Sequence, residues 1–199
     1  INLDVRVDEQ DLTDAFIGSD DENAGKVCGE NLTERKPDGG KLVIVESPQN
    51  AAVNARITGF EEKIRNKGFE VIRRIDAGGT ETGVQAEMAA VLAEDPQIGA
   101  VMCGDDRMAL QVLQALSDAG RSDILVYSVG GSPEVKSAMA DPESPMAGVG
   151  AQSPINMGKT AVRTAVSLLD GGAYEEEVSV ETFFINRDNL EMYGTDGWQ

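Results

Sequence analysis

Short apolar segments alternate with segments of helical periodicity along almost the whole chain, and this alternation constrains the fold more than any other feature. Residues 42–45 are all apolar, as is typical of a strand that is buried on both faces of a parallel sheet. We expect strands at residues 1–5, 15–18, 42–45, 69–75, 98–103, 124–129, 146–151 and 178–185. We expect helices that begin near residues 21 and 133, helices at 51–66, 82–94, 107–119 and 154–169, and an irregular tail at 189–199.

Successive strand–helix–strand units joined by short turns predict an α/β fold, a doubly wound and mostly parallel sheet with helices on both faces. A chain of 199 residues has room for one large domain or two small ones. In such sheets ligands bind beyond the carboxyl ends of the strands. The polar residues that directly follow the strands are therefore the candidates for function.

Composition narrows the classes of function. The formal net charge of −18 argues against nucleic acid and anionic membrane surfaces as partners. The sequence has no histidine, which removes Ser–His and Cys–His nucleophile pairs and most zinc sites, and neither a phosphate-binding loop nor the dinucleotide fingerprint occurs. We therefore expect no enzyme, no cofactor and no metal.

Cys28 and Cys103 lie in apolar segments, which favours two buried free thiols over a disulfide.

Two basic residues and one acid are candidates in the first half of the chain. Asp4 and Arg6 stand two apart at the end of the first expected strand, so that both side chains share a face and can hold a hydroxyl between them. A surface ion pair is the alternative. Arg56 is expected on the inward side of its helix, where it either meets a ligand or lies at the edge of the core with its charged end in water.

Further candidates follow the later strands. Asp105 and Asp106 come directly after residues 98–103; one of them must cap the next helix, and the other is then free to face a ligand. Gly130 either lets the backbone approach a ligand or simply forms a turn. The amide of Gln152 either reaches across a cleft or is solvated.

Taken in order, these motifs resemble the type I periplasmic sugar-binding proteins, above all the ribose-binding-type solute receptors of ABC importers, which share their core with LacI-type regulators. The resemblance covers residues 1–184. It rests on the following segments: Ile1-Asn2-Leu3-Asp4, Ile17-Gly18-Ser19-Asp20-Asp21, Arg56-Ile57-Thr58-Gly59-Phe60, Gly104-Asp105-Asp106-Arg107-Met108-Ala109-Leu110, Gly130-Gly131-Ser132-Pro133 and Ala151-Gln152-Ser153-Pro154.

The resemblance implies a two-lobed fold of the periplasmic-binding-protein type I, with the second lobe complete and the first partial. Residues 1–18 are then a remnant of the N-terminal lobe, and residues 19–152 form the C-terminal lobe. Residues 153–199 return to the N-terminal lobe and add the C-terminal strand and tail. Most of the N-terminal lobe, on this expectation, precedes Ile1 and is missing.

The resemblance also implies a ligand site. Asp4, Arg56, Asp105 and Gln152 match family positions that hydrogen-bond sugar hydroxyls. The family often has an arginine where this chain has the residue after Asp4, so Arg6 substitutes for it only if the strand end is rotated or bulged. Gly130 stands where many pentose and hexose binders have an aspartate, which removes one hydroxyl acceptor.

The function implied is a receptor that delivers a sugar or sugar-like polyol to an ABC importer when its two lobes close about a hinge. Its location is extracytoplasmic, either periplasmic or as a membrane-anchored lipoprotein. Its expected partners are the carbohydrate, the transporter permease and the missing N-terminal segment of the same protein, with no nucleic acid. The alternative is the effector-binding core of a LacI-type transcription regulator, whose DNA-binding helices would precede Ile1.

Overall fold

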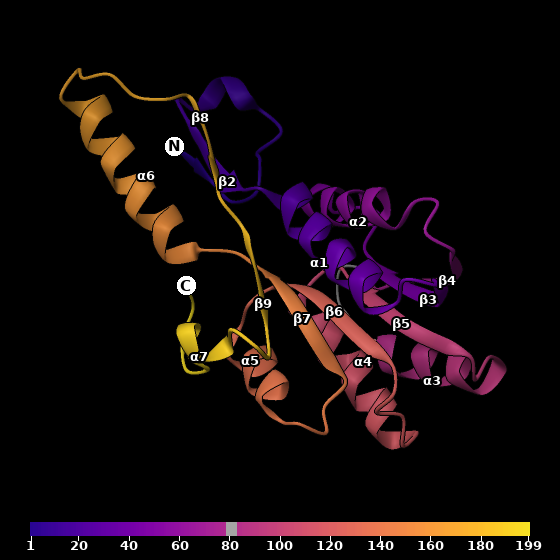
Figure 1. Cartoon of the computed structure of the whole chain (residues 1–199). Helices are drawn as coiled ribbons and strands as arrows, with labels where there is room; N and C mark the ends of the chain where they lie inside the picture. Colours follow the sequence, from indigo (N-terminus) through magenta and orange to yellow (C-terminus); the bar gives the residue numbers. More distant parts are fainter. Residues whose placement is uncertain (79–82) are drawn as a thin grey trace.

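The computed structural model of the chain describes residues 1–78 and 83–199, and in these residues the strands form two separate sheets (Figure 1). The small sheet has the order β1-β2-β8, and the large sheet has the order β4-β3-β5-β6-β7-β9. The strands are β1 (Asn2–Leu3), β2 (Phe16–Ser19), β3 (Gly40–Glu46), β4 (Phe69–Asp76), β5 (Ile98–Cys103), β6 (Leu125–Gly130), β7 (Met146–Ala151), β8 (Glu177–Val180) and β9 (Phe183–Asn186).

Helices connect most of these strands, as expected for a doubly wound fold. They are α1 (Asp21–Arg35), α2 (Ala51–Ile64), α3 (Val84–Glu94), α4 (Asp106–Asp118), α5 (Pro133–Ala140), α6 (Pro154–Leu169) and α7 (Leu190–Tyr193), with a 3-10 turn at Gln10–Leu12. Thr82, the expected first residue of the helix at 82–94, lies outside the described residues. The α/β class with mostly parallel pairing is confirmed.

The large sheet is covered by helices on both faces (Figure 1). The period of two along β3 sends Val43 and Val45 to the face that packs on α3, α4 and α5, and Leu42 and Ile44 to the face that packs on α1 and α2. All four side chains are fully buried, so the prediction of a strand buried on both faces is correct.

The expected strand at 178–185 is wrong as a single element. β8 pairs in parallel with β2 in the small sheet, whereas β9 pairs antiparallel with β7 in the large sheet. Between them the chain passes from one sheet to the other at Glu181 and Thr182, where the Thr182 hydroxyl donates to the Asp20 carbonyl oxygen at 3.0 Å. The tail is also less irregular than predicted, because α7 lies within it.

The small sheet has less cover than the large one. It is packed by α6, of which only Met157 and Thr164 are buried, while Val162 and Leu169 are exposed. The first expected strand is shortened to Asn2–Leu3, because Asp4 has a φ of +67° and the chain turns there.

Both cysteines are free and buried, as predicted. Burial raises the pKa of the Cys28 thiol to about 12, so it is unreactive at neutral pH. Among the described residues, we find no helix with the length and apolarity that a membrane span requires.

Candidate functional site

A cleft of about 690 Å³ opens at the carboxyl ends of the parallel strands. Its walls come from the turn after β1, the start of α2, the loops after β5, β6 and β7, and the tail. The lining residues are Asp4, Val5, Asn50, Ala52, Val53, Arg56, Asp105, Asp106, Arg107, Leu110, Val129, Gly130, Ser132, Glu134, Gln152 and Trp198. This is the edge of the sheet where α/β folds bind ligands.

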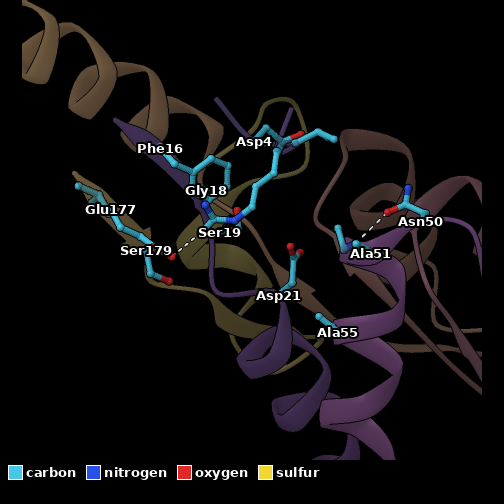
Figure 2. Close-up of a pocket in the computed structure, with 14 residues that line it drawn as sticks. Asp4, Phe16, Gly18, Ser19, Asp21, Asn50, Ala51, Ala55, Glu177 and Ser179 are labelled. Atoms are coloured by element: carbon cyan, nitrogen blue, oxygen red, sulfur yellow. Dashed lines mark hydrogen bonds and ion pairs between the residues drawn. The ribbon is translucent and has the colours of Figure 1, made fainter. Parts of the chain in front are cut away.

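The structure brings four of the five predicted site residues into this one cleft: Asp4, Arg56, Asp105 and Gln152. Arg6 lies in a smaller adjoining cavity of about 290 Å³, which Asp4 also lines. Figure 2 shows this cavity, with the Asp21 carboxylate pointing up between the small sheet and the start of α2.

Asp21, which lines the smaller cavity, and Arg56, which lines the cleft, form a partly buried ion pair. Arg56 Nε donates to Asp21 Oδ1 at 2.7 Å, and Arg56 Nη1 donates to the Gly104 carbonyl oxygen at 3.0 Å. Burial raises the pKa of Asp21 and outweighs the lowering by Arg56, with small further increases from Asp4 and Asp20. These two bonds hold the Arg56 guanidinium in place, and Nη2 is its one nitrogen without a partner among the described residues.

Arg56 occupies this position because α1 and α2 pack at very short range. A Cβ atom on Gly25 would lie 1.8 Å from the Arg56 carbonyl oxygen, and one on Gly59 would lie 2.0 Å from the Glu22 carbonyl oxygen. The two glycines therefore let the helix backbones touch and bring Asp21 within reach of Arg56.

The prediction that Asp4 and Arg6 share a strand face is wrong, because the strand ends before Asp4. The turn at Asp4 carries Arg6 over the ring of Phe16, with the guanidinium carbon 3.8 Å from the ring centroid, and Arg6 also pairs with Glu177. The Arg6 guanidinium is therefore engaged by the small sheet, while Asp4 faces both cavities.

The two aspartates after β5 have separate tasks. Asp105 is the N-cap of α4, and its Oδ1 accepts a hydrogen bond from the Met108 N–H at 2.9 Å. The expectation that the aspartate which does not cap the helix is free is wrong, because Asp106 is buried and accepts hydrogen bonds from the Ser128 hydroxyl and from the N–H groups of Gly131 and Ser132 at 2.6–2.8 Å. Asp105 is thus the carboxylate with an oxygen, Oδ2, left for other contacts, 3.6 Å from Arg107 Nη2.

Asp106 also explains why position 130 holds a glycine. A Cβ atom on Gly130 would lie 2.6 Å from Asp106 Oδ2, and Gly130 has a φ of +145°, which side chains rarely adopt. Burial raises the pKa of Asp106 against the lowering effect of its donors. The Asp106 carboxylate therefore fills the space beside position 130 that a side chain would enter.

Gln152 stands where the chain crosses between the two sheets. Its N–H donates to the Gly130 carbonyl oxygen at 2.9 Å, and its Nε2 donates to Asp21 Oδ1 at 3.3 Å. The chain also crosses between the sheets at Asp20 and at Thr182. These two crossings are joined, because Asn23 Nδ2 donates to the Thr182 carbonyl oxygen and hydroxyl at 3.0 Å. Hydrogen bonds therefore link the three crossings to one another, and Gln152 of this group lines the cleft.

Sequence reasoning missed three residues of the site. Asp21 is not among the candidates above, although it follows a strand in the way that Asp105 does. Asn50 caps α2 and lines both cavities. Trp198 lies in the tail at 189–199, where the sequence has no apolar periodicity that predicts a helix or a strand. Within the part of the chain that the structure describes, no group of three or more acidic or cysteine side chains is arranged to hold a metal ion.

Comparison with known proteins gives a consistent result. Residues 2–173 match the family model described as a periplasmic binding protein domain. The ribose import binding protein of Salmonella typhimurium is 28% identical over 182 residues, which cover 91% of this chain and 60% of that protein. The D-allose-binding periplasmic protein of Escherichia coli is 26% identical and is covered to 58% of its length. The chain thus spans about 60% of the length of these curated relatives.

Solved structures agree in fold. An ABC transporter solute binding protein from Agrobacterium vitis with bound allitol has a TM-score of 0.84 and 27% identity, with 96% of this chain and 68% of that chain covered. A periplasmic solute binding protein from Actinobacillus succinogenes with bound D-allose has a TM-score of 0.87 at 20% identity, covering 96% of this chain and 70% of the other.

Proposed function

The chain belongs to the periplasmic binding protein family, and on that premise we propose that its cleft binds a sugar or a sugar-like polyol for an ABC importer, without catalysis. The observation that carries the proposal is the convergence of Asp4, Arg56, Asp105 and Gln152 on one cleft at the carboxyl ends of the strands. The named relatives are import and solute binding proteins, which favours this reading over a LacI-type regulator.

The chemistry of the four side chains suits a polyol. Each sugar hydroxyl is both a donor and an acceptor. The carboxylates of Asp4 and Asp105 accept, Arg56 Nη2 donates, and the Gln152 amide does both. A sugar that lacks one of the matched hydroxyls leaves a buried partner without its hydrogen bond, at a cost of about 1–3 kcal/mol, which discriminates between epimers.

Closure of two lobes about the crossings follows from the same proposal. Residues 1–18 and the α6 region form one lobe, and residues 19–152 form the other, with β9 and the tail packed on the second. The three crossings at Asp20, Gln152 and Thr182 are the hinge in this proposal. Hinge closure changes φ and ψ at only a few residues between rigid elements, and the crossings are such residues. Closure is the signal that the transporter permease reads, outside the cytoplasm, whether the receptor is free or lipid-anchored.

A further segment of the same protein completes the small sheet in this proposal. Exposed apolar side chains support it, since a small sheet and its helix normally bury their apolar faces. These side chains are Leu3, Val5, Val7, Leu12, Val162, Val166 and Leu169.

Calorimetric titration of the full-length natural protein with D-ribose, D-allose and allitol tests the proposal. Asp105→Ser keeps an N-cap oxygen for α4 but removes the second carboxylate oxygen, so it avoids the loss of about 1 kcal/mol that an alanine would bring. We expect its dissociation constant to rise at least tenfold. Asp141→Ser is the control, because the Asp141 side chain also accepts a hydrogen bond from a backbone N–H, that of Glu143, and lies outside the cleft lining. Equal affinity of the Asp105→Ser protein and the wild type would refute the assignment.

A further inference from the structure

The tail carries the single tryptophan of the sequence, Trp198, into the wall of the cleft. Its side chain is the one aromatic group among the described residues that line this cleft, and the residue is 44% exposed. The remaining apolar lining consists of aliphatic groups such as Leu110 and Val129. The indole N–H has no hydrogen-bond acceptor among the residues that the structure describes, so it is available to a ligand.

Two anchors fix the backbone on either side of Trp198. On one side, the ammonium group of Lys136 donates a hydrogen bond to the Gly197 carbonyl oxygen. Lys136 is fully buried, and burial lowers its pKa against the opposing effects of Asp196 and Asp106. A buried ammonium group needs its acceptors, so the Gly197 carbonyl is held in place.

On the other side, the Gln199 carbonyl oxygen accepts hydrogen bonds from the Ser153 hydroxyl at 2.9 Å and from the Ile155 N–H at 3.3 Å. Ser153 is the N-cap residue of α6, but its side chain does not cap the helix. The Gln199 carbonyl instead satisfies a free N–H of the first helical turn. The tail is therefore joined to the crossing at Gln152 and Ser153, as Figure 1 shows from the position of the C label beside the start of α6.

The start of the tail is fixed as well. The Tyr193 ring stacks on Phe183 of β9, with ring centroids 5.1 Å apart. Trp198 thus stands between a rigid attachment to the large sheet and a rigid attachment to α6. Its place at the cleft is built into the fold and is not the result of a loose end folding back.

We propose that Trp198 is a ligand-binding residue of the cleft: its indole ring packs against the C–H face of the bound sugar, and its N–H donates to a hydroxyl. This inference rests on the proposed function and adds to it a stacking surface that the other described residues of the cleft do not provide. Lys136 is the positioning residue that holds the indole through Gly197. An aromatic ring suits a sugar because a sugar ring is apolar on its C–H faces and polar at its rim.

The test is a titration of the full-length protein with D-ribose, D-allose and allitol, followed both by calorimetry and by tryptophan fluorescence. The difference between the wild type and Trp198→Phe isolates the signal of Trp198, whatever other fluorophores are present. We expect this difference signal to saturate with the calorimetric dissociation constant. We expect Trp198→Leu to weaken binding about tenfold, Trp198→Phe to recover most of the loss, and Lys136→Met to shift the emission maximum and weaken binding.

Met192→Ala is the control, since Met192 belongs to the same tail segment, is exposed and does not line the cleft. Thermal melts identify any variant that fails to fold. The fluorescence titration of the wild type remains a test even if a variant does not fold. If the wild type binds sugar but the Trp198 signal stays constant and Trp198→Leu binds equally well, the inference is wrong while the proposed function stands. If the wild type binds no sugar, both are wrong.

Discussion

The helices α4 and α6 differ in what covers them, although both repeat apolar residues at helical spacing. α4 lies on the large sheet and buries Met108, Ala109, Val112, Ala115 and Leu116. α6 lies on the small sheet, and Val162, Val166 and Leu169 on it are exposed. The pattern of a helix therefore predicts that a face is to be buried, but not which part of the protein buries it. Among the described residues, the large sheet buries the apolar face of α4, whereas the small sheet leaves apolar side chains of α6 exposed.

The largest expected effect is in the core of the large sheet. Leu116→Ala removes a fully buried side chain of α4 and should lower the free energy of unfolding by about 2–5 kcal/mol. Leu169→Ala makes the same change on α6, where the side chain is 82% exposed, and should cost less than about 0.5 kcal/mol. Urea denaturation of the 199-residue chain, followed by circular dichroism, measures the free energy of unfolding of both variants. Equal losses would show that α6 is buried in solution and would end the comparison.

Glycine-to-alanine substitutions in the two regions should change the stability in opposite directions. Gly25→Ala places a Cβ atom against the Arg56 carbonyl oxygen and should destabilise by about 1–3 kcal/mol, because α1 and α2 must move apart. Gly158→Ala in α6 meets no atom within 4 Å and should stabilise by about 0.5–1 kcal/mol through helix propensity. Thermal melts compare the two. Destabilisation by Gly158→Ala would mean that another element packs on that side of α6.

The smallest effect concerns pH and the buried carboxylate of Asp106 in the large sheet. Because burial raises the pKa of Asp106 in the folded state, the folded protein binds a proton more readily than the unfolded chain. The destabilising contribution of this group is therefore present at neutral pH and is lost as the pH falls through the raised pKa. Asp106→Asn lacks this titration. The stability of the wild type relative to Asp106→Asn should rise by a fraction of a kcal/mol between neutral pH and about pH 4. A difference that is constant with pH contradicts the account.

The sequence predicted the large sheet better than the small one for physical reasons. Residues 42–45 and 146–151 are apolar throughout, which specifies a strand buried on both faces. Residues 178–185 hold apolar residues in both halves, so nothing local shows that the chain changes sheet at Thr182. The separation depends on the long-range bonds of Thr182 with Asp20 and Asn23.

The candidate site shows the same limit. Asp4, Arg56, Asp105 and Gln152 were placed correctly at one edge, because the carboxyl ends of parallel strands meet there. The division of tasks between Asp105 and Asp106 was not predictable, since both are good cap residues and only Ser128, from the next strand, distinguishes them. Trp198 reaches the cleft through contacts of the tail with Lys136 and Ser153, which lie about 45–60 residues earlier in the chain.

Native mass spectrometry of the full-length protein incubated with D-ribose, D-allose and allitol detects whether this cleft holds a sugar. We expect a bound species with the mass of one of these molecules at a stoichiometry of one, absent from the Asp105→Ser protein and present in the Asp141→Ser protein. A protein that carries none of them, or that carries one equally well after Asp105→Ser, would contradict the proposed function.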